Sequence, residues 1–293
     1  MSISREYRLR RKALMGAVCA LGLAAPAFAE TLAQPVEIRF EARVGKEPAR
    51  CDRAYTGVGK ANAGMRLQDL RVYVSALRLL GADGREVPVT LTPDGQWQSD
   101  QVALLDFENR TGNCNGTAAT NAVVRGKVPA GTYRGLLFEI GVPRGINHQD
   151  PTLASPPLNV TALTWPWRYG YKFVTIDLET SGGDAGPNHA TGFSIHIGST
   201  GCGEGSPTTP PGTPCGNSNR PSYKLEGFDP NSSKVVLDLG ALLSETDITV
   251  NAPTTASGCM SIPGDADCTG IMSRLGLPFD GRPSTGQRWV RAE

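Results

Sequence analysis

The 293-residue chain balances 29 Lys and Arg against 28 Asp and Glu, so it lacks the basic excess by which nucleic-acid-binding proteins attract phosphates. Its 39% of hydrophobic and 19% of charged residues are typical of an ordinary globular protein. The 35 glycines and 22 prolines favour many turns over long helices, and a mainly β fold is predicted.

The first 29 residues have the pattern of a cleaved signal peptide. A basic start at 5–12 precedes a short apolar run at 13–25 and the small-residue site Ala27-Phe28-Ala29. The apolar run is too short to span a bilayer, so we expect no stable membrane anchor. The alternative is that the segment is retained as such an anchor. Cleavage leaves a single domain, 30–293, in the periplasm.

Removing the signal peptide leaves six cysteines in the mature chain: Cys51, Cys114, Cys202, Cys215, Cys259 and Cys268. An even number in an exported protein indicates three disulfides, for which fifteen pairings exist. Two pairs, Cys202–Cys215 and Cys259–Cys268, would each close a Gly- and Pro-rich loop, and Cys51–Cys114 then follows by elimination. The loop 201–219 is expected on the surface.

Alternating apolar residues predict a half-buried strand at 36–44. Further strands are predicted at 70–80, 87–91, 102–107, 121–128, 132–142, 171–178, 192–199, 222–228 and 234–239. The strands on either side of Pro129-Ala-Gly131 are expected to pair as a hairpin. Short strands separated by turns predict an antiparallel β-sandwich or barrel with disulfide-stapled loops and one or two short helices.

One helix is predicted in the middle of the chain. Ser155 followed by Pro156 is a plausible helix start, and Leu158, Ala162 and Trp165 fall at helical spacing. A helical turn is also expected near the C-terminus, at 270–277.

The most aromatic segment is 161–173, which holds two of the four tryptophans. Two of the three histidines, His148 and His196, lie at similar distances on either side of it, and His189 lies in a polar loop. Neutral imidazole is a good copper ligand, and two imidazoles suit Cu(I) or part of a Cu(II) site. The pattern therefore suggests a metal site, although local capping by His148, a core position for His196 and a solvated His189 are the ordinary alternatives.

Several short motifs in this chain resemble those of one family. They are Leu105-Asp-Phe107, Gly141-Val-Pro143, Asn147-His148, Trp165-x-Trp167-x-x-Gly-Tyr-Lys-Phe173, His196-x-Gly-Ser-Thr-Gly-Cys202, Asn219-Arg-Pro221 and Gly258-Cys-Met-Ser261. In this order they are similar to the MbnP-type periplasmic copper-binding proteins, or metallo-mystery pair system four-Cys motif family. One departure is Cys51-Asp-Arg53, where the family pattern has glycine after the cysteine.

The resemblance implies a copper-binding protein rather than an enzyme. It implies that a partner dihaem enzyme of the MauG/MbnH type oxidises one tryptophan, Trp165 or Trp167, to kynurenine. His148, His196 and the kynurenine would then hold Cu(I) or Cu(II), with His189 as a further candidate. Indole nitrogen is only a hydrogen-bond donor, whereas kynurenine offers an aniline nitrogen and a ketone.

Other functions fit the residues less well. A blue-copper site needs a free thiolate, but all six cysteines are expected to be paired. A serine hydrolase would have its serine in Gly-x-Ser-x-Gly, whereas Ser199 lies in Gly-Ser-Thr-Gly. Ser199, His148 and Asp106 are therefore a poor candidate for a hydrolase triad. The main alternative is a binding module that needs no metal. Its aromatic platform for a sugar or another flat ligand would consist of Trp165, Trp167, Tyr169 and Tyr171.

Overall fold

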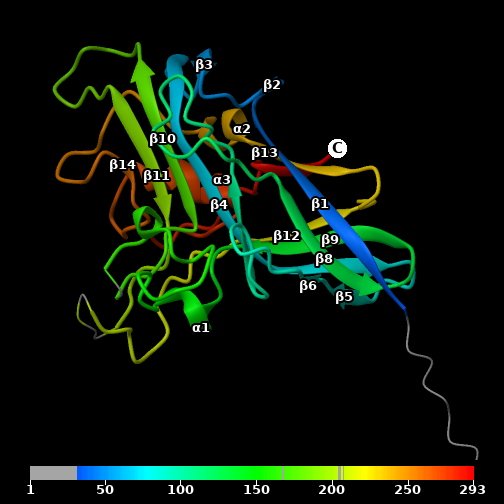
Figure 1. The fold of residues 1–293 in the computed structure, drawn as a ribbon. Coiled ribbons are helices and arrows are strands. Elements are labelled where there is room, and N and C mark those ends of the chain that lie inside the picture. Colours follow the sequence, from blue (N-terminus) through cyan, green and yellow to red (C-terminus); the bar gives the residue numbers. More distant parts are fainter. Residues whose placement is uncertain (1–31, 167, 204–205, 207) are drawn as a thin grey trace, which may run out of the picture. The chain divides into compact units, whose positions relative to one another are not determined.

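The computed structural model describes residues 32–293 except 167, 204–205 and 207, and the expected signal peptide lies outside this part of the chain. Two β-sheets form the domain (Figure 1). The first contains, in order, β15 (Val290–Ala292), β13 (Lys234–Asp238), β1 (Ala33–Val44), β8 (Val123–Pro129) and β6 (Thr90–Leu91), with β2 (Glu47–Pro48) beside β1. The second contains, in order, β12 (Ser222–Glu226), β9 (Tyr133–Ile140), β4 (Ala63–Gly81), β10 (Val174–Ser181), β11 (Gly192–Ile197) and β14 (Gly258–Cys259), with β3 (Ala54–Val58), β5 (Glu86–Pro88) and β7 (Val102–Asp106) also on β4.

The apolar faces of the two sheets share one core, as expected for a sandwich. Val36, Ile38, Phe40 and Ala42 of β1 are buried and alternate with more exposed residues, as the period-two pattern predicts. The Phe40 ring meets Phe138 of β9 edge-on, with 5.6 Å between the ring centroids. Most strand pairs are antiparallel, but β1–β13 and β11–β14 are parallel.

Strand β4 is the longest strand described and pairs with β3, β5, β7, β9 and β10. It begins at Ala63, seven residues before the strand predicted from Leu70. The prediction missed this first part because the pairing with β10 shifts register near Leu67. Such a bulge adds a residue and breaks the period-two alternation on which the prediction depends. A second irregularity surrounds Ala76, whose φ is +52°.

The hairpin predicted across Pro129-Ala-Gly131 is wrong. Strand β8 pairs with β1 and β6 in the first sheet, whereas β9 pairs with β4 and β12 in the second. A Pro-Ala-Gly turn can join two paired strands or connect one sheet to the other, so the turn residues alone do not predict pairing. Here β8 pairs with the longer strand β1 in the first sheet, and β9 pairs with the longer strand β4 in the second. The predicted strand 87–91 is likewise divided into β5 and β6.

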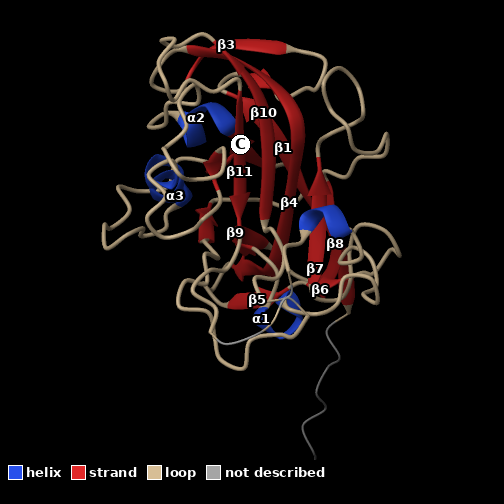
Figure 2. Cartoon of the chain, turned by 90° about the vertical axis from the view of Figure 1, so that its left-hand side faces the viewer, coloured by secondary structure: helices blue, strands red, loops and turns tan. Residues whose placement is uncertain are grey.

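The helix predicted from Ser155 to Trp165 is also wrong, because this segment forms turns and the short 3-10 helix η1 (Thr161–Leu163). Pro156 is followed by Pro157, and a residue before proline is disfavoured in the α region. The α-helices described are α1 (Arg144–Asn147), α2 (Leu239–Leu243) and α3 (Cys268–Leu275), and the last of these confirms the helical turn predicted near 270. Figure 2 shows α2 and α3 along one side of the strands. Across the described residues, no helix is long and apolar enough to cross a membrane.

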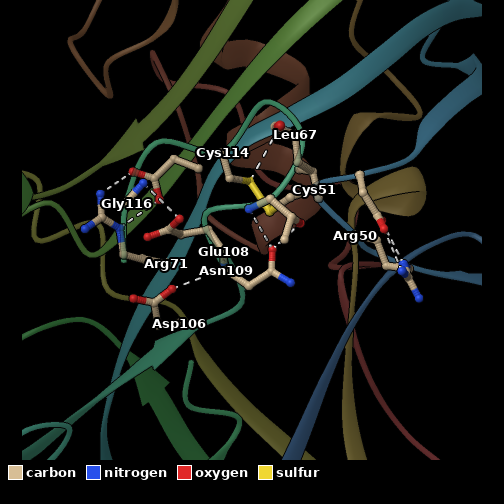
Figure 3. The surroundings of a disulfide bond; sticks show 12 residues. Arg50, Cys51, Leu67, Arg71, Asp106, Glu108, Asn109, Cys114 and Gly116 are labelled. Carbon is tan, nitrogen blue, oxygen red and sulfur yellow. Dashed lines mark hydrogen bonds and ion pairs between the residues drawn. A yellow bond between two sulfur atoms is a disulfide. The ribbon is translucent and has the colours of Figure 1, made fainter. Parts of the chain in front are cut away.

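Three disulfides join the cysteine pairs favoured from the sequence: Cys51–Cys114, Cys202–Cys215 and Cys259–Cys268. Cys51 and Cys114 are buried and fasten the loop after β7 to the segment before β3 (Figure 3). The same loop is folded by Glu108, whose carboxylate accepts the backbone N–H groups of Gly116 and Thr117.

Candidate metal centre

The candidate site is built around a turn that carries Trp165. We call residues 164–171, of which Trp167 is not among the described residues, the tryptophan turn. Thr164 and Tyr171 form an isolated bridge, and the Trp165 N–H donates to the Gly170 carbonyl over 3.0 Å. Gly170 has φ +76°, and a Cβ there would lie 2.4 Å from the Asn147 carbonyl oxygen, so only glycine fits.

The Trp165 indole covers Gly198, which lies just beyond the end of β11. A Cβ on Gly198 would fall 2.4 Å from Cζ3 of the indole, so the absence of a side chain makes room for the ring. His196 lies two residues earlier, and residues two apart in an extended chain share a face. The fold therefore brings Trp165 to the end of the strand that carries His196.

His196 is oriented by Asp177 of the neighbouring strand β10. The distance from His196 Nε2 to Asp177 Oδ1 is 2.9 Å, and the Ser194 hydroxyl donates to the same oxygen. Burial raises the pKa of Asp177, but the hydrogen bond and charge of His196, the hydrogen bond from Ser194 and the nearby charge of Lys172 together leave the pKa below its usual value. Because a carboxylate only accepts, Nε2 carries the proton, and the lone pair of the imidazole is on Nδ1. Carboxylate–histidine pairs of this kind are typical of metal-ligating histidines.

Further ionic side chains continue this face across β4 and β7. Arg71 of β4 is paired with Asp69 and lies opposite Asp106 of β7. Thr175 of β10 lies between Arg71 and His196, and its buried hydroxyl has no hydrogen-bond partner among the residues described. A cleft of about 670 Å³ opens over this face, lined by His196, Asp177, Asp69, Arg71 and by Ala162 just before the tryptophan turn.

One carboxyl of this face gives the protein a pH-dependent stability. Burial and the nearby Glu108 carboxylate raise the pKa of Asp106 from 3.8 to about 7. Between about pH 4 and 7 the Asp106 carboxyl of the folded protein therefore keeps a proton that it has lost in the unfolded chain, so the contribution of Asp106 to the free energy of unfolding falls as the pH rises. In urea denaturation across this range, the stability of the wild type should fall relative to that of Asp106→Asn as the pH rises. Asp83→Asn, at an exposed turn, is the control and should follow the wild type; an unchanged slope in Asp106→Asn would contradict the expectation.

His148 follows α1 and reaches the loop after β11. Asn147 fixes its environment, because the Asn147 Oδ1 accepts the Tyr171 N–H and thereby directs its NH₂ group to His148 Nε2, 3.1 Å away. The same Nε2 lies 3.6 Å from the Cys215 Sγ. Since an amide NH₂ only donates, Nε2 accepts and carries the lone pair.

Both histidines are thus linked to the tryptophan turn through neighbouring residues, and the contacts differ. His148 is joined to it through Asn147 and Tyr171, and His196 through Gly198 and the indole of Trp165. Only one set of three or more His, Cys, Asp or Glu ligand atoms within 4.8 Å of one another occurs among the described residues, and it contains His148, Cys202 and Cys215 rather than His196. His189 is exposed in the loop between the end of β10 and the start of β11, at the end of this strand pair that lies away from His196 and Gly198.

The same geometry bears on the alternative functions. Tyr171 is fully buried, and its hydroxyl donates to the Leu158 carbonyl, so it is not available to an exposed aromatic platform. Ser199 donates to the Ser218 carbonyl and Asp106 accepts the Glu108 N–H, so these two side chains are engaged elsewhere and not with each other.

Sequence reasoning assigned no supporting role to three residues that hold the candidate ligands in place: Asp177, Asn147 and Gly198, although the last two lie in the motifs Asn147-His148 and His196-x-Gly198. A signal existed for Asp177, because Thr175 and Asp177 share one face of the predicted strand 171–178, and pairing of this strand with 192–199 brings that face beside His196. The roles of Asn147 and Gly198 depend on contacts between distant loops, for which the pattern of residues carries no signal.

Two comparisons with known proteins identify the family of this chain. The family model described as MbnP matches residues 33–261, which is most of the chain. The chain belongs to the MbnP family. A solved structure, "MbnP from Methylosinus trichosporium", is 32% identical and superposes with a TM-score of 0.80 over 89% of this chain and 98% of its own. Among curated proteins none matches the chain significantly. The residues matched by the MbnP family model include the tryptophan turn, both candidate histidines and five of the six disulfide-bonded cysteines, Cys268 being the exception.

Proposed function

We propose that this MbnP-family chain is an exported protein that binds copper through His148, His196 and an oxidised tryptophan. The observation that carries the proposal is the position of Trp165: its indole lies against the end of the strand that carries His196, and its turn is hydrogen-bonded to the residue before His148. Three buried or half-buried disulfides support an oxidising compartment such as the periplasm.

The donor set suits copper. His196 offers Nδ1 and His148 offers Nε2, and neutral imidazoles bind both Cu(I) and Cu(II). The indole of Trp165 has no lone pair for a metal, so an unmodified side chain at this place would leave the third position unfilled. Oxidation to kynurenine supplies an aniline nitrogen there, and a dihaem enzyme of the MauG/MbnH type is the proposed oxidant.

Mass spectrometry of protein purified from its native host tests the modification. Trypsin releases residues 145–168 as one peptide, because no Lys or Arg lies between Arg144 and Arg168, so fragment ions must separate Trp165 from Trp167. We expect Trp165 to have gained one oxygen and lost one carbon, whereas Trp97 and the buried Trp289 serve as unmodified internal controls. Modification of Trp167 instead would move the ligand within the same turn, and four unmodified tryptophans would refute the kynurenine proposal.

A further inference from the structure

We propose a second, redox-dependent metal site in this chain, formed by His148 with the thiolates of Cys202 and Cys215 when their disulfide is reduced. The ligand atoms of these three residues already lie within 4.8 Å of one another. The site requires no modified tryptophan and shares only His148 with the copper site proposed above. The ion bound at this site would be a thiophilic one, of the class of Zn²⁺ or Cu(I).

The distances fit tetrahedral coordination once the sulfurs separate. With metal–sulfur and metal–nitrogen bonds of about 2.3 and 2.0 Å, a sulfur and a nitrogen on one zinc lie about 3.5 Å apart. The Cys215 Sγ and the His148 Nε2 are 3.6 Å apart in the disulfide form. His148 therefore needs little movement, and only the two sulfurs must move out of bonding distance.

The imidazole is already in the state that a metal requires. The Tyr171 N–H occupies the Asn147 Oδ1, so the Asn147 amide presents its NH₂ group to His148 and Nε2 accepts. A metal would replace the amide hydrogen on the same lone pair. Asn147 is buried and hydrogen-bonded to the backbone, and it thereby fixes the direction in which Nε2 points.

Reduction should reach this disulfide before the other two. Cys202 and Cys215 are half-buried at the base of a surface loop, whereas the four other disulfide cysteines are at most 4% exposed. A dithiol reductant transfers two electrons and two protons, so that it forms its own disulfide and leaves Cys202 and Cys215 as thiols. Binding of a divalent ion then releases two protons from the thiols.

The test begins with the folded protein treated with a limiting dithiol under anaerobic conditions. Thiol labelling and peptide mapping should find label on Cys202 and Cys215 only. Titration with Co²⁺ should then give one thiolate-to-cobalt charge-transfer signal per chain, which Zn²⁺ displaces and which reoxidation abolishes. Opening of a buried disulfide first, or reduced protein without a thiolate–cobalt signal, would overturn the proposal.

Variants separate this site from the proposed copper site. His148→Ala should weaken Co²⁺ binding to the reduced protein by about tenfold or more, and Cys202→Ser with Cys215→Ser should remove the charge-transfer signal, with circular dichroism as the check that each variant is folded. His196→Ala should leave the cobalt signal unchanged, because His196 is not in this group. Cobalt affinity unaffected by His148→Ala would refute the role of His148, whatever the fate of the copper site.

Discussion

Replacement of both Cys51 and Cys114 by alanine is expected to lower the free energy of unfolding by roughly 2 to 5 kcal/mol. The two residues are 63 positions apart, and closure of a loop of that length accounts for about 4 kcal/mol in the chain-entropy model. Both side chains are buried, and the bond fastens a long irregular loop to the strands around β4. Equilibrium urea denaturation of the two proteins measures the difference directly.

The matched control is Cys202→Ala with Cys215→Ala. That bond closes only 13 positions and staples a surface loop, so its loss should cost less. A larger loss of stability in this control than in the Cys51 and Cys114 variant would contradict the structural role assigned to the long-range disulfide.

Copper binding by the oxidised protein is expected to weaken by about tenfold or more in His196→Ala and in His148→Ala, since each removes a proposed ligand. Asp177→Asn should weaken binding by about 10- to 100-fold, because the carboxylate that orients His196 is lost while the imidazole remains. His189→Ala is the matched control and should bind copper normally, because its imidazole is exposed in a loop at the other end of the β10–β11 pair. Equal affinity in the wild type and in the variants of His148 and His196 would remove both histidines from the site.

The period-two pattern was a reliable guide wherever one strand face is buried, as in β1, whose alternating residues are buried as predicted. It could not reveal which strands pair. The turn Pro129-Ala-Gly131 joins two sheets rather than two neighbours, because pairing is decided by packing across the whole core. The first part of β4 was missed for a different reason: the bulge near Leu67 adds a residue to the strand, and the local alternation of buried and exposed residues fails there.

The candidate site divides in a similar way. His148, His196 and the tryptophans were identifiable because rare residue types cluster around one aromatic segment and resemble a family pattern. Their supports, Asp177, Asn147 and Gly198, are common residue types that act through contacts across 19, 24 and 33 positions, namely with His196, Tyr171 and Trp165. The proximity of His148 to Cys215 across 67 positions was equally invisible in the sequence.

Copper affinity before and after oxidation tests the central claim most directly. Protein produced without a dihaem partner would be titrated with Cu(I) against a competing chelator, then treated with the partner enzyme and peroxide and titrated again, beside Trp165→Phe handled in the same way. The wild type should bind copper weakly before treatment and more tightly after it, while Trp165→Phe should stay at the weak level throughout. Equal wild-type affinities before and after a treatment that mass spectrometry shows to have oxidised the tryptophan would contradict the proposal.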